Sequence, residues 1–140
     1  MSLMEIRCQY PCDTKELTMQ VDVVHGDYPK NKRAIKCKAI WDTGASDTTI
    51  ATNIVRAIGL RRLNLPPRLT HTANGDYLSY AYEACLSLSK DYPPFKMKVY
   101  EIPPSDIDVL IGMDIIRLGR FEIAPSKEKL DLTFEITKKE

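Results

Sequence analysis

The sequence predicts an all-β domain, folded as a closed barrel or sandwich with one or two short helices. Three observations support this fold class. Apolar and polar residues alternate in several short stretches, turn-forming dipeptides separate the stretches, and only two segments show helical spacing. At 140 residues the chain is long enough for one core and too short for two full lobes.

The alternating stretches are typical of strands that bury one face. They occur at residues 17–23, 35–41, 78–88, 97–99, 107–111 and 130–136. Residues with strong turn preferences lie between them. These are Gly26-Asp27, Pro66-Pro67, Asn74-Gly75, Pro93-Pro94 and Pro103-Pro104. Short strands at this spacing favour a barrel or sandwich over a wound α/β sheet.

Two short helices interrupt the strands. Apolar residues from Thr52 to Ile58 have helical spacing, and Gly59 follows as a natural helix-ending residue. A second segment, from Met113 to Leu118, stops in the same way before a glycine.

The sequence divides into an N-terminal segment, residues 1–16, and a principal domain, residues 17–140. Residues 1–3 precede a second methionine, Met4, and we treat them as added residues outside the fold. No assignment of secondary structure is made before Leu17.

The composition argues against several classes of protein. Lys and Arg number 20 against 19 Asp and Glu, and this balance lacks the basic excess typical of nucleic-acid binding. No apolar run reaches the length of a membrane span, and no secretory signal is recognisable. Without such a signal we expect reduced thiols in a cytoplasmic protein, and without a Cys-x-x-Cys pair or clustered His we expect no metal site. The cysteines are Cys8, Cys12, Cys37 and Cys85.

Asp42-Thr43-Gly44-Ala45 follows directly after the alternating stretch that ends at Trp41. A carboxylate next to core residues costs free energy unless hydrogen bonds or a partner charge stabilise it. Thr43 supplies a hydroxyl, and Gly44 lets the chain turn and another backbone approach closely. The motif therefore predicts a loop that presents the Asp42 carboxylate and holds it with backbone N–H and hydroxyl donors.

A second motif, Asp-Val-Leu-Ile-Gly-Met-Asp, occupies residues 108–114 and leads into the second predicted helix. Between the two motifs, Asn74-Gly75 has the composition of a type I′ turn and predicts the tip of a hairpin. The order of strand, Asp-Thr-Gly-Ala, hairpin, Ile-Gly, helix and terminal strands resembles a retropepsin-like aspartic protease. The resemblance covers about residues 17–136. The run Ile-Gly-Met-Asp-Ile-Ile is more similar to the cellular and bacterial members than to the viral ones.

This resemblance implies a catalytic role for Asp42, with Thr43 hydrogen-bonded across a dimer and Gly44 below the paired carboxylates. It also implies positions that bind the substrate, with the hairpin acting as a mobile flap. These positions are Ala45, Ser46, Asn74, Gly75, Ile111 and Gly112.

The chain departs from the viral members at two positions that form an ion pair in those enzymes. Ser46 stands where they carry Asp, and Met113 stands where they carry Arg. Both partners of this ion pair are replaced together, so the two departures are consistent with each other. The hairpin also lacks a glycine-rich tip, so viral flap contacts do not transfer to this chain.

Aspartic protease chemistry needs two carboxylates, and the sequence has one Asp-Thr-Gly motif. We therefore expect a homodimer in which each subunit contributes one Asp42. The resulting hypothesis is an aspartic endopeptidase that hydrolyses an extended polypeptide with an activated water and needs no cofactor.

Other interpretations remain open. The chain can be an inactive dimer that binds peptides in the same cleft, or a β-rich structural module in which Asp42 only forms a turn. Tyr77, Tyr80 and Tyr82 can line a substrate cleft or pack against neighbouring strands.

The acidic residues of the second motif allow a metal site as an alternative. We favour a role for Asp114 at the start of its helix and expect Asp106 and Asp108 to be solvated. The pattern Asp-x-Gly also occurs in the phosphate loop of actin-like ATPases, but those folds need two large domains.

Overall fold

The computed structural model describes residues 2–73 and 75–137. Within these residues, twelve strands and two short helices follow one another. Their bounds are β1 Ser2–Pro11, β2 Thr18–His25, β3 Ala34–Trp41, β4 Thr49–Ala51, α1 Thr52–Ile58, β5 Arg61–Arg62, β6 Arg68–Thr72, β7 Gly75–Ser79, β8 Ala81–Ser87, β9 Phe95–Ile102, β10 Val109–Ile111, α2 Met113–Ile116, β11 Arg120–Ser126 and β12 Lys129–Thr137.

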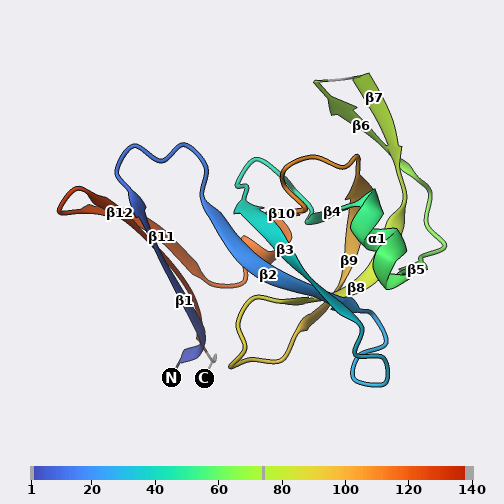
Figure 1. The fold of residues 1–140 in the computed structure, drawn as a ribbon, viewed down its shortest axis with the longest axis horizontal. Helices are drawn as coiled ribbons and strands as arrows, with labels where there is room; N and C mark the ends of the chain where they lie inside the picture. Colours follow the sequence, from blue (N-terminus) through green and yellow to red (C-terminus); the bar gives the residue numbers. More distant parts are fainter. Residues whose placement is uncertain (1, 74, 138–140) are drawn as a thin grey trace.

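A closed barrel forms the centre of the fold (Figure 1). Its strands neighbour one another in the order β2-β3-β10-β4-β9-β8, and an additional pairing of β2 with β8 closes the ring. β3 and β10 are parallel, with Val109 opposite Ala39, whereas β2 and β3 are antiparallel. The all-β fold class, the closed barrel and the two short helices are as the sequence predicts.

Alternation along the strands places one set of side chains inside the barrel. Val21 and Val23 of β2 and Ala39 of β3 are almost fully buried, whereas Lys36 and Lys38 between the core positions of β3 are exposed. Burying a side chain of valine size contributes about 1.5–3 kcal/mol relative to leaving it exposed. The period-two pattern therefore fixes which face of each strand points inward.

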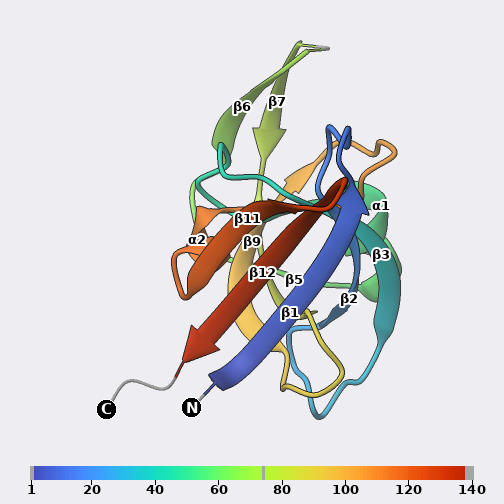
Figure 2. The ribbon, with the colours of Figure 1, turned by 90° about the vertical axis from the view of Figure 1, so that its left-hand side faces the viewer.

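A three-stranded sheet of both chain ends covers one side of the barrel, in the order β1-β12-β11 (Figure 2). Three aromatic rings join this terminal sheet to the barrel. The Trp41 ring lies 5.3 Å from that of Phe121 and 5.2 Å from that of Phe134, measured between centroids. Such tilted pairs add to the burial of apolar area.

The N-terminal segment of residues 1–16 contains β1, a strand that the sequence analysis does not assign. β1 pairs along its length with β12, starting with Ser2 opposite Thr137, and it buries Met4 and Ile6. Met4 and Ile6 begin a period-two pattern that continues through Cys8 and Tyr10, so the signal for this strand was present. Residues 2 and 3 therefore belong to a strand.

Several predicted elements have different bounds in the structure. The stretch of residues 78–88, predicted as one strand, divides at Tyr80 into β7 and β8, because β7 leaves the barrel to pair with β6. The second helix ends at Ile116 and does not reach Leu118, which is 51% exposed and so has little core contact to hold it in a helix. α1 has the predicted bounds, and Gly59 ends it in the left-handed conformation, with φ 77°.

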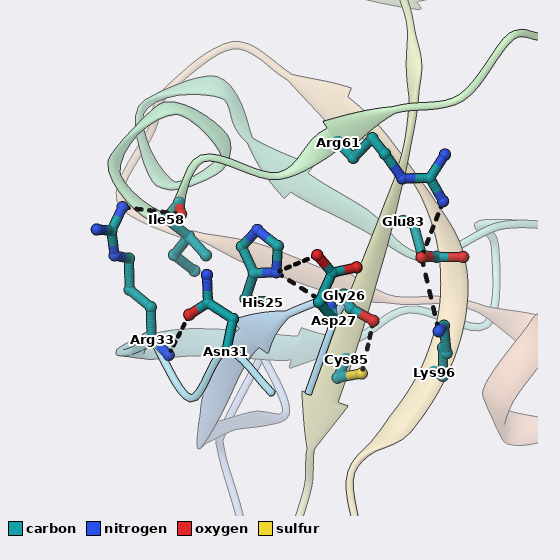
Figure 3. A network of polar contacts seen from close by, with 10 residues as sticks. All are labelled: His25, Gly26, Asp27, Asn31, Arg33, Ile58, Arg61, Glu83, Cys85 and Lys96. Atoms are coloured by element: carbon teal, nitrogen blue, oxygen red, sulfur yellow. Dashed lines mark hydrogen bonds and ion pairs between the residues drawn. The ribbon is translucent and has the colours of Figure 1, made fainter. Parts of the chain in front are cut away.

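The connection between β2 and β3 lies at the end of β3 remote from Asp42, and polar contacts hold it in place (Figure 3). A Cβ atom on Gly26 would lie 2.7 Å from the Glu83 carbonyl oxygen, so this turn needs glycine to approach β8. Arg33 donates a hydrogen bond from Nη1 to the Ile58 carbonyl at the end of α1, at 3.3 Å. These contacts tie the turn to both β8 and α1.

All four cysteines are free, as expected from their spacing. Within residues 2–73 and 75–137, no helix has both the length and the apolar character that crossing a membrane requires.

Burial of Cys37 predicts a loss of stability at alkaline pH. Desolvation, with the nearby charge of Asp108 adding to it, raises the pKa of this thiol from 9.0 to about 12. The native state keeps the proton that the unfolded state releases, so the free energy of unfolding should fall as pH rises from about 9 to about 12. Urea unfolding across this range should show a smaller fall for Cys37→Ala, and an unchanged fall for the exposed control Cys12→Ala. Equal slopes in all three proteins would contradict the role of Cys37.

Candidate active site

The Asp42 loop continues directly from the end of β3. Asp42 donates its backbone N–H to the Ile111 carbonyl at 2.9 Å, which extends the pairing of β3 with β10 by one residue. The Gly44 N–H donates to Asp42 Oδ1 at 2.9 Å, and the Ala45 N–H donates to the Asp42 carbonyl at 3.2 Å. The loop thus folds back on Asp42 and supplies a backbone donor to its half-buried carboxylate, as the motif predicts.

The second loop, at the end of β10, crosses the Asp42 loop at very short range. Met113 donates its N–H to the Ala45 carbonyl at 2.8 Å. A Cβ atom on Gly112 would lie 2.7 Å from the Asp47 carbonyl carbon and 2.9 Å from the Ala45 carbonyl oxygen. The close approach of the two backbones therefore requires glycine at position 112. The backbone conformation does not require it, because a φ of −93° is open to any residue.

Thr48 and Asp114 join these two loops through a buried network. The Thr48 hydroxyl donates to Asp114 Oδ1 at 2.7 Å and accepts the Gly112 N–H at 3.1 Å. The Thr48 N–H donates to Asp114 Oδ2 at 2.9 Å, and the Ile115 N–H donates to Oδ1 at 2.9 Å. Because Thr48 is fully buried, removing either its hydroxyl or the Asp114 carboxylate would leave the other polar group without this hydrogen bond.

The sequence analysis did not find this network. It expected Asp114 at the start of a helix, which is correct, but it assigned no role to Thr48. The apolar residues that follow Thr49 were the available signal, because Thr49–Ala51 forms the fully buried strand β4.

Ser46 and Met113 are both exposed, at the positions where viral enzymes place an ion pair. In this chain the contact between Thr48 and Asp114 connects the same two loops.

A hairpin of β6 and β7 stands above the barrel (Figures 1 and 2). Leu69 pairs with Leu78 and Thr72 with Gly75, so the predicted turn lies at its tip. Gly75 has a φ of 116°, which side chains rarely allow. Asn74, the other predicted tip residue, lies outside the described residues.

The first strand of the hairpin is anchored to the Asp42 loop. Arg68, at the start of β6, forms an ion pair with Asp47, and its guanidinium lies 3.9 Å from the centre of the Tyr100 ring. The ring limits the directions that the guanidinium can take, which favours one geometry of the ion pair.

The second strand is anchored to Glu101 of β9, which is only 8% exposed. The Tyr77 hydroxyl donates to Glu101 Oε1 at 3.0 Å, and the Tyr80 N–H donates to Oε2 at 3.2 Å. The Ser79 hydroxyl donates to the Glu101 carbonyl at 2.7 Å. The base of the hairpin is therefore held on both strands, whereas its tip projects from the barrel.

These contacts describe the environment of the three tyrosines. Burial and then the hydrogen bond to Glu101 raise the pKa of Tyr77 to about 12. Burial also raises the pKa of Tyr82. The Arg62 guanidinium stacks on the Tyr80 ring, 3.4 Å from its centre.

The structure also shows the surroundings of Asp106 and Asp108, in and just before the second motif. Among residues 2–73 and 75–137, no group of three His, Cys, Asp or Glu side chains has the arrangement to hold a metal ion. Asp106 is exposed, as expected. Asp108 is only half-buried, and its carboxylate accepts the Lys38 N–H at 2.9 Å, so the expectation that it is simply solvated was wrong.

The open end of the barrel gathers most of the predicted site residues. Thr43 and Gly44 are exposed and Ala45 is half-buried, on a loop braced by the buried pair Ile111 and Gly112. The Asp42 carboxylate thus lies on a rigid support next to surface that the single chain leaves open.

Comparison with known proteins identifies the family. The profile of the aspartyl protease family matches residues 24–115, which include both loops and the hairpin. The DNA damage-inducible protein 1 of Saccharomyces cerevisiae is 29% identical over 108 residues. This match covers 74% of the chain and 24% of the yeast protein, so the chain spans about a quarter of that relative's length.

Two solved structures share the fold. A retropepsin-like aspartic protease from Rickettsia conorii matches with a TM-score of 0.57 and 19% identity, over 95% of this chain and 94% of that one. The EIAV protease in complex with the inhibitor HBY-793 matches with a TM-score of 0.50 and 17% identity, over 75% of this chain and 88% of that one. The resemblance to retropepsin-like proteases, including cellular and bacterial members, is confirmed. The chain belongs to the aspartyl protease family and has the retropepsin-like fold.

Proposed function

We propose that two copies of this chain form an aspartic endopeptidase with one active site. The observation that carries this proposal is the Asp42 loop, which presents a single carboxylate with its neighbours Thr43 and Gly44 exposed. The family membership and the rigid bracing of the loop support the same function.

The dimer follows from the chemistry of the two carboxylates. A two-fold axis beside Asp42 brings the Asp42 carboxylates of the two subunits close together, in identical environments. Two carboxylates at short range cannot both ionise, so they share one proton and titrate as a pair. In this arrangement Thr43 reaches across the axis with its hydroxyl, and Gly44 allows the two loops to approach.

Hydrolysis then uses both forms of the carboxylate. The ionised Asp42 accepts a proton from water while the water oxygen attacks the carbonyl carbon of the peptide bond. The protonated Asp42 of the other subunit donates a hydrogen bond to the carbonyl oxygen and so stabilises the negative charge that develops there. The proton held by the first carboxylate passes to the amide nitrogen as the carbon–nitrogen bond breaks.

The proposed substrate is an extended polypeptide that lies between the hairpin and the two Asp42 carboxylates. A peptide in this position presents alternate side chains to opposite walls of the cleft. In this proposal Ala45 and Ser46 contact the peptide from the loop, and Gly75 contacts it from the hairpin. Water is the only co-reactant in this mechanism, so the proposal requires no cofactor.

Dilution tests the shared site directly. Activity per chain should fall as the protein is diluted below the dissociation constant of the dimer, and Thr43→Ala should move this fall to higher concentration. A lost hydrogen bond at an interface costs about 1 kcal/mol per copy, and more if its partner stays buried. Ultracentrifugation of the same samples gives the dimer fraction. Activity per chain that stays constant while the dimer dissociates would contradict the proposal, and a dimer that binds peptides without cleaving them would favour a binding protein.

A further inference from the structure

β9 is paired on both sides along only part of its length. On one side β8 pairs with Phe95 to Tyr100, but on the other side β4 starts to pair only at Tyr100. Within the described part of the chain, residues 95–98 therefore have no strand neighbour on the β4 side. In an antiparallel pair, alternate residues direct both N–H and C=O away from the partner, so this edge can bind another extended chain.

A groove of about 290 Å³ lies beside this edge. Phe95 and Met97 line it from β9, and Ile115 and Leu118 line it from α2 and the turn after it. Leu118 is 51% exposed, so part of this apolar lining faces solvent. A peptide that adds to a sheet is bound by two features, a free strand edge and the apolar pockets beside it.

Three cations complete the lining of the groove, namely Lys96, Lys98 and Arg117, and all three are exposed. Lys96 lies 3.7 Å from Glu83, at the limit of an ion pair, and keeps 58% of its side chain exposed. Lys98 lies over the Tyr100 ring at 5.2 Å, an interaction that leaves its charge without a carboxylate partner.

The two acidic residues in the lining already have partners inside the chain. Asp47 forms the ion pair with Arg68, and Asp114 accepts hydrogen bonds from Thr48. Among the described residues, Lys98 and Arg117 form no ion pair, whereas the charge of Asp47 is paired with Arg68, so an occupant of the groove would meet two available positive charges. Lysines on a free edge also repel the same edge of a second copy, which argues against pairing between identical strands.

We propose that this edge groove, formed by residues 95–98 and 115–118, binds an extended segment of the polypeptide substrate that is rich in acidic and apolar residues. The inference rests on the proposed function, because it places the segment outside the bond that is cleaved. Asp47 connects the two sites, since it lines the groove and follows Asp42 by five residues on the same loop. A substrate that leaves the cleft past this loop reaches the free edge of β9 next.

The test measures binding without cleavage. The full chain carrying Asp42→Asn is titrated into a fluorescent peptide of alternating Glu and Leu, and into a matched peptide of alternating Lys and Leu. We expect the acidic peptide to bind more tightly. Adding Lys98→Glu and Arg117→Glu should weaken its binding about tenfold or more, because attraction becomes repulsion. The matched control is Lys15→Glu with Lys129→Glu, two exposed lysines outside the groove.

Hydrogen exchange locates the bound peptide. We expect slower exchange at the backbone amides of residues 95–98 and no comparable change in the hairpin of residues 68–79. Equal binding by the groove and control variants, no binding by either peptide, or protection confined to the hairpin would each overturn the edge groove. If the parent protein, with Asp42 unchanged, binds the peptide at residues 95–98 but cleaves no polypeptide, the proposed protease activity is contradicted while the proposed groove is supported.

Discussion

Asp42→Asn should abolish peptide cleavage while leaving the fold intact. The substitution keeps the shape of the side chain and an oxygen that accepts the Gly44 N–H, but it removes the ionisable group from both halves of the site. General acid–base catalysis contributes about a hundredfold to ten-thousandfold in rate, and here both the acid and the base are lost. Turnover of a peptide library should therefore fall by about a thousandfold or more.

The matched control is Asp106→Asn, which removes an exposed carboxylate just before the second motif. Thermal melting of both variants should stay close to that of the parent protein. Turnover by Asp42→Asn equal to that of Asp106→Asn would remove Asp42 from the mechanism.

Mixing extends this test to the dimer. An excess of the Asp42→Asn chain should capture the parent chain in mixed dimers that have one carboxylate, so activity per parent chain should fall. Activity that is independent of the added variant would show that each chain works alone.

Gly112→Ala should destabilise the protein and disturb the site at the same time. The added Cβ would lie 2.7 Å from the Asp47 carbonyl carbon and 2.8 Å from its oxygen, and these are backbone atoms that cannot rotate away. Overpacking of this kind costs about 1–3 kcal/mol. We expect a lower urea midpoint, and activity reduced by more than the loss of folded protein explains, because the two loops must separate.

Gly44→Ala is the control for the stability measurement. Its Cβ would meet only the Asp42 carboxylate oxygen, at 3.2 Å, so the free energy of unfolding should fall less than in Gly112→Ala. If both variants unfold at the same urea concentration, the crossing of the two loops is not a tightly packed point of the fold.

Some features of the active site could be predicted and others could not. The position of Asp42 was predictable because a strand pattern ends at Trp41 and a turn-forming motif follows it. The bracing of that loop was not, because Thr48 and Asp114 are 66 residues apart and neither has an unusual local context. Glu101 likewise follows shortly after the alternating stretch of residues 97–99, and nothing in its neighbours indicates that it anchors the hairpin.

The sequence by itself determined the elements whose signals are local. The alternation in β2 and β3, the helical spacing of α1 and the glycine that ends it act within a few residues. They therefore predict the type of these elements, the bounds of α1, and the bounds of β2 and β3 to within two residues. The tertiary structure alone decided how such elements are joined. β7 separates from β8 at Tyr80, the β1 strand pairs with β12 at the other end of the chain, and β9 keeps a free edge beside α2. These features depend on which strands find each other across the barrel, and contacts between residues distant in sequence leave little trace in any one stretch of it.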